Sequence, residues 1–389
     1  MKHFRLLGLF GLCFFSSAVQ AQAQPVEPRW SLAIHGGAGV IERANLSPEQ
    51  DAAYRAALTR ALEAGSTVLR SGGEALDAIQ AAIELMEDDP LFNAGRGAVF
   101  TAEGKTELDA AVMNGADLTA GAVAGLTRTR HPIAAARAIM EQSPHVMLIG
   151  EGADAFSASV GLEQVDPAFF FTERRWQALE RQLRERGDPI PSRPEGAPAP
   201  GQGLANLPQP PLNERKFGTV GAVALDQSGN LAAGTSTGGM SGKRWGRVGD
   251  VPIVGAGTYA SNRDGCAVSA TGDGEYFIRA TVARDICAEI GRSLPSTPQE
   301  ALAYDTHIQR ICEGEAEPAR CWRQARLDTT ITEAEIAEVG QLGGTGGVIV
   351  MVRDGVPTFA MNTSGMYRGS VSSDEPLRVA IYADEDARP

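Results

Sequence analysis

Lys216-Phe217-Gly218-Thr219-Val220-Gly221-Ala222-Val223-Ala224-Leu225-Asp226 follows the longest proline-rich run of the chain and opens its most strand-like segment. The residues from Thr219 to Leu225 are small or β-branched, which suits a buried strand. A polar, glycine-containing turn follows at 226–230, and residues 231–236 return as a second strand. The sequence therefore predicts a core β-hairpin that begins at the Gly218–Thr219 bond, directly after a segment poor in apolar residues.

The Gly218–Thr219 bond has two interpretations. Gly-Thr pairs are common at the start of a strand, where they mark only a turn followed by a β-branched residue. If the bond is instead cut, Thr219 gains a free α-amine with a pKa of about 7.7 to 8.0, which can take the proton from the threonine's own hydroxyl near neutral pH. A single residue would then serve as nucleophile and general base.

Further blocks rich in glycine, threonine and acidic residues recur along the chain. They are Ala33-Ile34-His35-Gly36-Gly37-Ala38-Gly39, Pro90-Leu91-Phe92-Asn93-Ala94-Gly95, Glu107-Leu108-Asp109-Ala110, Gly121-Ala122-Val123-Ala124-Gly125, Thr235-Ser236-Thr237-Gly238-Gly239-Met240, Gly246-Arg247-Val248-Gly249-Asp250, Ser269-Ala270-Thr271-Gly272-Asp273-Gly274-Glu275 and Gly343-Gly344-Thr345-Gly346-Gly347. In this order, and together with the stretch around Thr219, they closely resemble the plant-type asparaginases, also called isoaspartyl peptidases, which are N-terminal-nucleophile hydrolases.

The resemblance implies an α+β fold, specifically the four-layer αββα sandwich of that hydrolase class. In this arrangement two antiparallel sheets stack on each other and helices cover both outer faces. Periodicity alone supports only a mixture of strands and helices in one domain. The four layers are therefore an expectation from the resemblance.

The resemblance also assigns the reacting groups. Thr219 matches the nucleophile, and Thr237 matches a second threonine that hydrogen-bonds and tunes it. Thr271 and Gly272 match an oxyanion hole made of a hydroxyl and a backbone N–H. Each of these residues taken alone would be an unremarkable strand-end or turn residue.

Arg247, Asp250 and Gly274 match the family's substrate clamp. A guanidinium grips an α-carboxylate in bidentate fashion, and a carboxylate pairs with an α-ammonium. The backbone carbonyl of Gly274 would help to hold that ammonium. The simpler alternative is a solvated Arg-Asp pair in a glycine-rich loop.

The implied function is that of an autoprocessing isoaspartyl peptidase with L-asparaginase activity, which cleaves β-aspartyl dipeptides and the side-chain amide of L-asparagine. Cleavage between Gly218 and Thr219 would give an α-subunit of residues 22–218, with a flexible proline-rich connector at 187–216, and a β-subunit of residues 219–389. Both subunits would form one domain, and the family's assembly implies a homodimer of such αβ protomers. The chemistry needs no cofactor.

Two other functions remain open. A glycosylasparaginase of the same fold would use the same kind of threonine, but that threonine usually follows an aspartate, whereas Gly218 precedes it here. A catalytically inactive periplasmic amino-acid-binding protein would keep the clamp and stay uncut. A denaturing gel distinguishes the binding protein from the enzymes, and assays with a glycosylated asparagine distinguish the two enzymes.

Composition excludes several other classes. The 389-residue chain has a formal net charge of −13 and no basic cluster, which argues against a nucleic-acid or anionic-membrane partner. The histidines beyond residue 30, at positions 35, 131, 145 and 307, lie in no zinc-protease or nucleophile-elbow motif. Residues 255–260 match G-x-G-x-x-A, but a turn follows them instead of a helix, so a nucleotide site is rejected.

The first residues predict a signal peptide at 1–21, because Lys2 and Arg5 precede a short apolar run and small residues follow it. We therefore expect a periplasmic or secreted protein without a membrane span. In that oxidising compartment Cys312 and Cys321 would close a short loop as a disulfide, with free thiols as the alternative. Spacing does not decide how the four cysteines at positions 266, 287, 312 and 321 pair.

The loop after residue 86 is a candidate ion site. The resemblance implies a structural sodium ion bound by backbone carbonyls of Met86, Glu87, Asp89, Phe92, Ala94 and Arg96. An ordinary helix-to-strand connection is the alternative, because backbone ligation leaves little side-chain signature. Arg96 stands where we expect a smaller or apolar residue.

The remaining pattern predicts secondary structure. We expect helices at 75–86, 132–142, 151–160 and 172–186, and another whose N-terminal cap is Ser47 with Pro48 and Gln50. We also expect strands at 97–100, 107–114, 120–127 and 251–255, a glycine loop at 35–39, one helix at 275–290 and a helical surface insertion at 293–336. A last hairpin at 348–362 would close the sheet.

Overall fold

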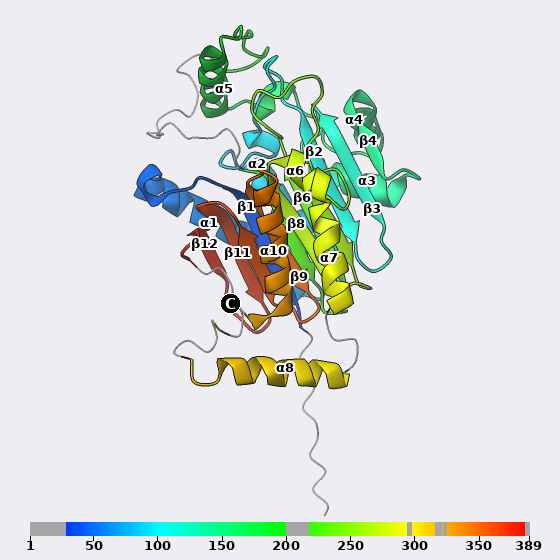
Figure 1. Ribbon diagram of the computed structural model, residues 1–389. Coiled ribbons are helices and arrows are strands. Elements are labelled where there is room, and N and C mark those ends of the chain that lie inside the picture. Colours follow the sequence, from blue (N-terminus) through cyan, green and yellow to red (C-terminus); the bar gives the residue numbers. More distant parts are fainter. Residues whose placement is uncertain (1–28, 200–217, 294–297, 316–320, 322–324, 386–389) are drawn as a thin grey trace, which may run out of the picture.

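The computed structural model describes residues 29–199, 218–293, 298–315, 321 and 325–385 (Figure 1). The predicted signal peptide at 1–21 and residues 200–216 of the predicted connector lie outside these ranges. Within them, no helix is long and apolar enough to cross a membrane.

Two sheets form the centre of the molecule. The larger has eight strands in the order β12-β11-β1-β5-β6-β2-β3-β4, and the smaller has four in the order β10-β9-β8-β7. Only the β3–β4 pair is parallel. The strand bounds are β1 Ser31–Gly39, β2 Leu108–Asn114, β3 Ala120–Leu126, β4 Met147–Ile149, β5 Val220–Leu225, β6 Leu231–Thr237, β7 Thr258–Ser261, β8 Cys266–Gly272, β9 Gly346–Val352, β10 Pro357–Met361, β11 Gly365–Ser372 and β12 Arg378–Tyr382.

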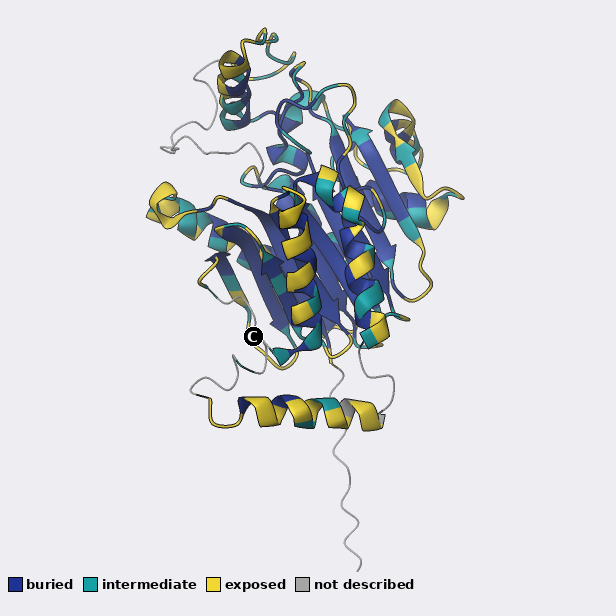
Figure 2. Ribbon diagram, in the orientation of Figure 1, coloured by how far each residue is buried: buried dark blue, intermediate teal, exposed yellow. Residues whose placement is uncertain are grey.

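Helices cover the outer face of each sheet (Figures 1 and 2). The bounds are α1 Pro48–Arg70, α2 Ala75–Asp88, α3 Pro132–Gln142, α4 Gly150–Ser159, α5 Glu173–Arg186, α6 Gly274–Ala280, α7 Val282–Ser293, α8 Pro298–Cys312 and α10 Leu327–Gln341. Helices α1, α2 and α3 pack on the larger sheet, and α7 and α10 pack on the smaller one. Strands β1, β5 and β6 of the larger sheet face β7, β8 and β9 of the smaller. The fold is thus α+β, as predicted.

The β5–β6 hairpin is confirmed, and its pattern explains its position between two cores. Val220, Ala222 and Ala224 join the apolar cluster beneath α1 and α2. Val223 and Leu225 join the second cluster, which fills the space between the sheets and reaches α7 and α10. Alternate residues of a strand point to opposite faces, so a strand buried on both faces needs small or apolar residues throughout.

The start of α1 is also confirmed. Gln50 N–H donates to Ser47 Oγ at 3.3 Å, and Ser47 N–H donates to Gln50 Oε1 at 3.0 Å. This reciprocal capping box satisfies two backbone donors that the first turn of a helix leaves without partners. The predictions for α2, α3, α4 and α5 are confirmed to within two residues at each end.

Three predictions of local structure near the sheets are wrong. Residues 35–39 continue strand β1, with an irregularity between His35 and Ala38. Residues 95–97 form a 3-10 turn, so the strand predicted at 97–100 is reduced to a single bridge at Phe100. The strand predicted at 251–255 is a series of turns, and the strand begins at Thr258. Glycine-rich segments were misread because their conformation depends on neighbouring strands.

The single helix predicted at 275–290 is broken. Thr281 has a φ of +51°, which separates α6 from α7. At the start of α7, Ala283 and Arg284 donate their backbone N–H groups to the carbonyls of Ala256 and Gly255 at 3.2 and 2.8 Å. These contacts with a distant loop redirect the chain, and periodicity within the helix does not reveal them.

The sequence predicts that 293–336 is a surface insertion, and this prediction is wrong for the C-terminal part of the segment. Its C-terminal part begins α10, which packs on β9, β10 and α7 and buries Ile336. The prediction also omitted β11 and β12, which complete the larger sheet beside β1. The hairpin at 348–362 therefore closes only the smaller sheet.

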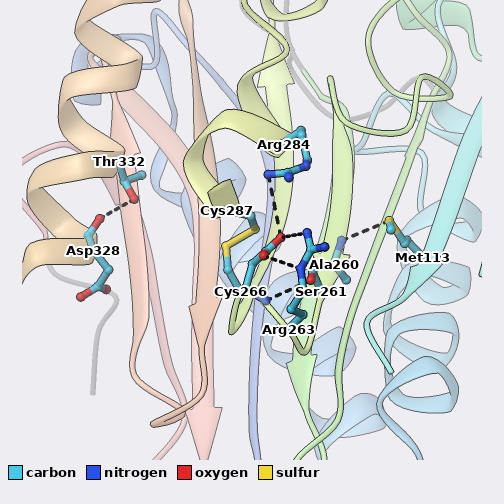
Figure 3. The surroundings of a disulfide bond; sticks show 10 residues. Met113, Ala260, Ser261, Arg263, Cys266, Arg284, Cys287, Asp328 and Thr332 are labelled. Atoms are coloured by element: carbon cyan, nitrogen blue, oxygen red, sulfur yellow. Dashed lines mark hydrogen bonds and ion pairs between the residues drawn. A yellow bond between two sulfur atoms is a disulfide. The ribbon is translucent and has the colours of Figure 1, made fainter. Parts of the chain in front are cut away.

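The cysteines form two disulfides. The predicted Cys312–Cys321 bond is present. The second, Cys266–Cys287, was not predicted; it joins the start of β8 to α7 and is fully buried (Figure 3). It fastens an outer helix to the strand whose other end carries Thr271 and Gly272.

The described part of the predicted connector, residues 187–199, contacts the body of the protein. Arg193 pairs with Glu173 at the start of α5 at 2.7 Å, and its guanidinium lies over the Trp176 ring. Asp188 pairs with Arg244 at 2.5 Å. The described part of this segment therefore contacts α5 and the loop that carries Arg244.

Candidate active site

Two threonines meet at the end of the β5–β6 hairpin. Thr219 directly precedes β5 and Thr237 ends β6, and the pairing of Val220 with Ser236 sets the two ends side by side. Their hydroxyl oxygens are 2.9 Å apart. Gly239 N–H donates to the Thr237 hydroxyl oxygen at 3.0 Å, which fills one of its two acceptor positions and leaves its own proton able to point at the Thr219 oxygen.

Gly218 is held tightly between two other backbone segments. Its carbonyl accepts a hydrogen bond from Asn93 N–H at 2.8 Å. Its φ is +123°, and a Cβ there would lie 2.6 Å from the Asn93 nitrogen. On the other side, a Cβ on Gly37 would lie 2.4 Å from the Gly218 nitrogen. The peptide before Thr219 is therefore fixed in a conformation and a space that only glycine accepts.

Thr271 and Gly272 end β8, on the smaller sheet. Thr271 has the same parity along β8 as Ser269, which contacts His35 of the larger sheet, so its side chain lies on the face between the sheets. It is 1% exposed. A Cβ on Gly272 would lie 2.4 Å from the Thr345 carbonyl oxygen, which explains why a glycine stands there.

The clamp residues Arg247, Asp250 and Gly274 lie together at the start of α6. Arg247 donates from Nε and Nη2 to the two carboxylate oxygens of Glu275 at 2.8 and 2.9 Å. A Cβ on Gly274 would lie 2.7 Å from Asp250 Oδ1 and 3.0 Å from Arg247 Nη2. Gly274 thus borders both charged side chains.

Asp250 is a buried carboxylate with an unfilled position. It is 5% exposed, and within the described residues its Oδ2 has no hydrogen-bond partner. Burial raises the pKa of Asp250 to about 7, although the nearby Arg247 opposes the shift. A buried carboxylate oxygen without a donor is costly, so this oxygen is suited to a cationic group of a ligand.

The structure adds residues to which sequence reasoning gave no role. Asn93 holds the Gly218 carbonyl, and Glu275 holds Arg247. The His35 ring lies 3.1 Å from the Thr219 carbonyl oxygen. All three stand in the quoted glycine-rich blocks, so the blocks marked them, but only the tertiary contacts show what they touch.

The loop after α2 contains the residues predicted to hold sodium. The carbonyls of Glu87 and Phe92 face Gly95 and Gly97, where a Cβ would lie 2.4 and 1.9 Å from their oxygens. The Arg96 guanidinium lies over the Phe169 ring, 5.8 Å from its centroid. The described residues contain no group of three or more His, Cys, Asp or Glu side chains that could hold a metal ion.

Comparisons with known proteins agree with this geometry. A family model described as asparaginase matches residues 28–313. The chain is 44% identical to the isoaspartyl peptidase of Escherichia coli (strain K12), over 91% of this chain and 96% of that protein. It is 39% identical to a putative isoaspartyl peptidase/L-asparaginase of Dictyostelium discoideum (90% and 98%), and 36% identical to a probable isoaspartyl peptidase/L-asparaginase 2 of Arabidopsis thaliana (91% and 99%).

Proposed function

The chain belongs to the asparaginase family, and from this premise we propose that it is an autoprocessing threonine hydrolase of isoaspartyl dipeptides and of the L-asparagine side-chain amide. The observation that carries the proposal is the 2.9 Å contact between the Thr219 and Thr237 hydroxyls, directly after a constrained Gly218. Asp250, whose buried Oδ2 has no hydrogen-bond partner among the described residues, and the nearby Arg247 support an amino-acid head group as the ligand.

Self-cleavage uses the same groups. The Thr219 oxygen attacks the Gly218 carbonyl carbon, its proton passes to the Thr219 nitrogen, and the bond from that carbon to this nitrogen breaks, which leaves an ester on the Thr219 side chain and a free α-amine. Water then hydrolyses the ester, releasing the carboxylate of Gly218 and restoring the hydroxyl. The Asn93 N–H, 2.8 Å from the Gly218 oxygen, stabilises the charge that develops there.

Substrate turnover repeats this acyl transfer on a bound ligand. Arg247 grips the α-carboxylate, while Asp250 and the Gly274 carbonyl hold the α-ammonium. The Thr219 α-amine takes the hydroxyl proton as the oxygen attacks the side-chain carbonyl, and this proton leaves with the ammonia or amine. The Thr271 hydroxyl and Gly272 N–H stabilise the oxyanion, and water hydrolyses the resulting β-aspartyl ester to aspartate.

Turnover assays in parallel test the proposal. Purified protein is incubated with L-asparagine, β-aspartyl-leucine and a glycosylated asparagine, and a denaturing gel monitors the chain. We expect two fragments, 22–218 and 219–389, with activity toward the first two substrates. Preferential cleavage of the glycosylated asparagine would favour a glycosylasparaginase, and an uncut chain that binds aspartate reversibly would favour a binding protein.

Replacing Gly218 with alanine should slow self-cleavage at least tenfold. An alanine Cβ would collide with Asn93 and displace the scissile carbonyl from its N–H donor, and the positive φ adds about 1 to 3 kcal/mol of strain. A gel time course measures the rate. Gly229→Ala is the matched control, since Gly229 has a φ of +82° but open space around it. Equal processing rates in the two variants would contradict the role of the Asn93 contact.

We propose further that the loop after α2 holds a structural sodium ion through carbonyls of Met86, Glu87, Asp89, Phe92, Ala94 and Arg96. The ion would supply rigidity to the segment that positions Asn93, and it would take no part in bond breaking. The backbone carbonyls of Glu87 and Phe92 around Gly95 and Gly97 support this assignment. Arg175, which donates to the Gly97 carbonyl at 2.8 Å, is the nearby positive charge with which the ion would compete.

If sodium binds, the melting temperature should be a few degrees higher in sodium chloride than in choline chloride at equal ionic strength. A ligand that binds only the folded state stabilises it by about 1 to 3 kcal/mol when its concentration is well above its dissociation constant. Gly97→Ala, whose Cβ would lie 1.9 Å from the Phe92 oxygen, should remove this difference. Identical melting of the unsubstituted protein in both salts would disprove the assignment.

The remaining assignments rest on the family and the sequence. The two stacked sheets with helices outside each support the four-layer αββα sandwich of N-terminal-nucleophile hydrolases as the fold. We propose one domain of two subunits, 22–218 and 219–389, a homodimer of such protomers, and export to the periplasm or the medium after removal of residues 1–21. The two disulfides are consistent with an oxidising compartment.

A further inference from the structure

A chain of buried polar side chains crosses the space between the two sheets beneath Thr219. His35 of β1 and Thr235 of β6 come from the larger sheet, and Thr258 of β7 and Ser269 of β8 come from the smaller. All four are 0% exposed. Polar groups buried to this extent are retained in an otherwise apolar core only when they satisfy one another.

The hydrogen bonds of His35 decide which of its ring nitrogens carries a hydrogen. The Thr219 carbonyl oxygen can only accept, so His35 Nδ1, 3.1 Å away, must carry a hydrogen. Burial lowers the pKa of His35 to about 3, against the effect of this bond, so the ring is neutral and Nε2 has no hydrogen. Nε2 therefore accepts from the Ser269 hydroxyl at 2.9 Å.

The hydroxyls of Thr235 and Thr258 continue this series of hydrogen bonds, each donating toward His35. The Ser269 oxygen, having donated to His35, accepts from the Thr235 hydroxyl at 2.7 Å. Thr235 in turn accepts from the Thr258 hydroxyl at 2.7 Å. The carbonyl oxygens of Gly257 and Val251 are second acceptors for the Thr235 and Thr258 hydroxyls, at 3.3 and 3.2 Å, while both ring nitrogens of His35 are occupied. His35 therefore has no free lone pair with which to act as a general base.

We propose that His35 is a positioning residue of the active site, which holds the Thr219 carbonyl through Nδ1–H while Ser269 and the threonines behind it fix the ring tautomer. The need for such a contact follows from cleavage. Before it, Thr219 is also held through Gly218, whose carbonyl binds Asn93. Afterwards that link is broken, and the terminal residue keeps the His35 contact to its carbonyl and the Thr237 contact to its hydroxyl.

Losing the carbonyl contact would let the terminal residue rotate about its own backbone bonds. The α-amine and the hydroxyl must lie in one fixed relation to each other and to the oxyanion donors for the attack, and misplacement by about 1 Å costs on the order of 100-fold in rate. Substrate is held by Arg247 and Asp250, which do not touch His35. The contact should therefore affect kcat and leave KM nearly unchanged.

Two variants separate positioning from packing. In His35→Asn the side-chain amide places an N–H near the Nδ1 position, and in His35→Gln the amide lies farther out, near Nε2 and Ser269. Both remove the ring and lose similar packing. We expect kcat per processed chain, with processing verified by intact mass, to fall about 100-fold in His35→Gln and less than tenfold in His35→Asn, with KM within threefold of the unsubstituted value.

Equal loss of kcat in the two variants, or losses that follow their melting temperatures, would mean that His35 serves only packing and would overturn the proposal. The kinetic test rests on the proposed function, so a second readout is independent of activity. Nitrogen-15 correlation spectra of uncut Thr219→Ala protein should show Nδ1 protonated and Nε2 unprotonated from about pH 5 to 9. The opposite tautomer would overturn the inference. If the tautomer is the expected one but the unsubstituted protein does not hydrolyse its substrates, the result counts against the proposed function instead.

Discussion

Replacing Thr219 with alanine should leave the protein as one uncut chain and abolish its amide hydrolysis, a loss of at least about 10⁴-fold in kcat. The effect is this large because the same oxygen attacks the Gly218 carbonyl during processing and the substrate during turnover. The Thr237 hydroxyl, 2.9 Å from the Thr219 hydroxyl, would be left without a nucleophile to assist. A denaturing gel and an ammonia-release assay with L-asparagine measure the two losses.

Thr219→Ser is the matched control, because it keeps the hydroxyl and removes only the methyl group. It should be processed, at a reduced rate, and should retain measurable turnover. Thermal melting of both variants should stay close to that of the parent, since the Thr219 side chain is only partly buried. Two fragments in Thr219→Ala, or activity in the uncut chain, would show that the reaction does not depend on this residue.

Replacing Asp250 with asparagine should lower kcat/KM for L-asparagine by about 10² to 10³-fold, mostly through KM. Removing one charge from a buried ion pair costs about 2 to 5 kcal/mol, and Asp250 Oδ2 is the buried oxygen without a protein donor that would receive the substrate ammonium. Succinamic acid, which is L-asparagine without its α-amino group, provides the comparison. The parent should strongly prefer asparagine over it, and the variant should lose that preference.

The same substitution should stabilise the protein at high pH. The folded-state pKa of Asp250 is raised to about 7, chiefly by burial, with Arg247 acting against the shift and the carboxylates of Glu275 and Asp109 adding to it. Between about pH 4 and 7 the folded state therefore holds a proton that the unfolded state releases, so this residue's contribution to stability falls as the pH rises.

Above pH 7 the penalty of the ionised side chain is fully present, at most about 4 kcal/mol from three pKa units. Asp250→Asn removes the charge, so its melting temperature should exceed that of the parent by a few degrees at about pH 8.5, and by less at about pH 5.5. A variant that is less stable than the parent at both values, by the same amount, would contradict the raised pKa. If Asp250 is kept charged and buried in order to bind substrate, Asp250→Asn should weaken substrate binding and raise the stability of the protein.

The sequence predicted structural features correctly where they depend on contacts between residues close together in the chain. The Ser47 capping box and the β5–β6 hairpin depend on residues a few positions apart, and both are present as predicted. The break at Thr281 and the packing of α10 depend on segments tens of residues away, and both were misread. The short loop closed by Cys312 and Cys321 was predicted, whereas Cys266–Cys287 required knowing that α7 lies on β8.

For the proposed active site, the sequence predicted the chemistry: a threonine after a glycine, a second threonine, an Arg-Asp pair and glycine turns, in an order that resembles one hydrolase family. Residue type and order carry this information because nucleophile, clamp and close backbone approach each require particular side chains. Only the tertiary structure decided which groups support them. Asn93 against Gly218, Glu275 against Arg247 and His35 against Thr219 are contacts between different elements, formed where two sheets and their loops meet, and no spacing along the chain encodes the distances between them.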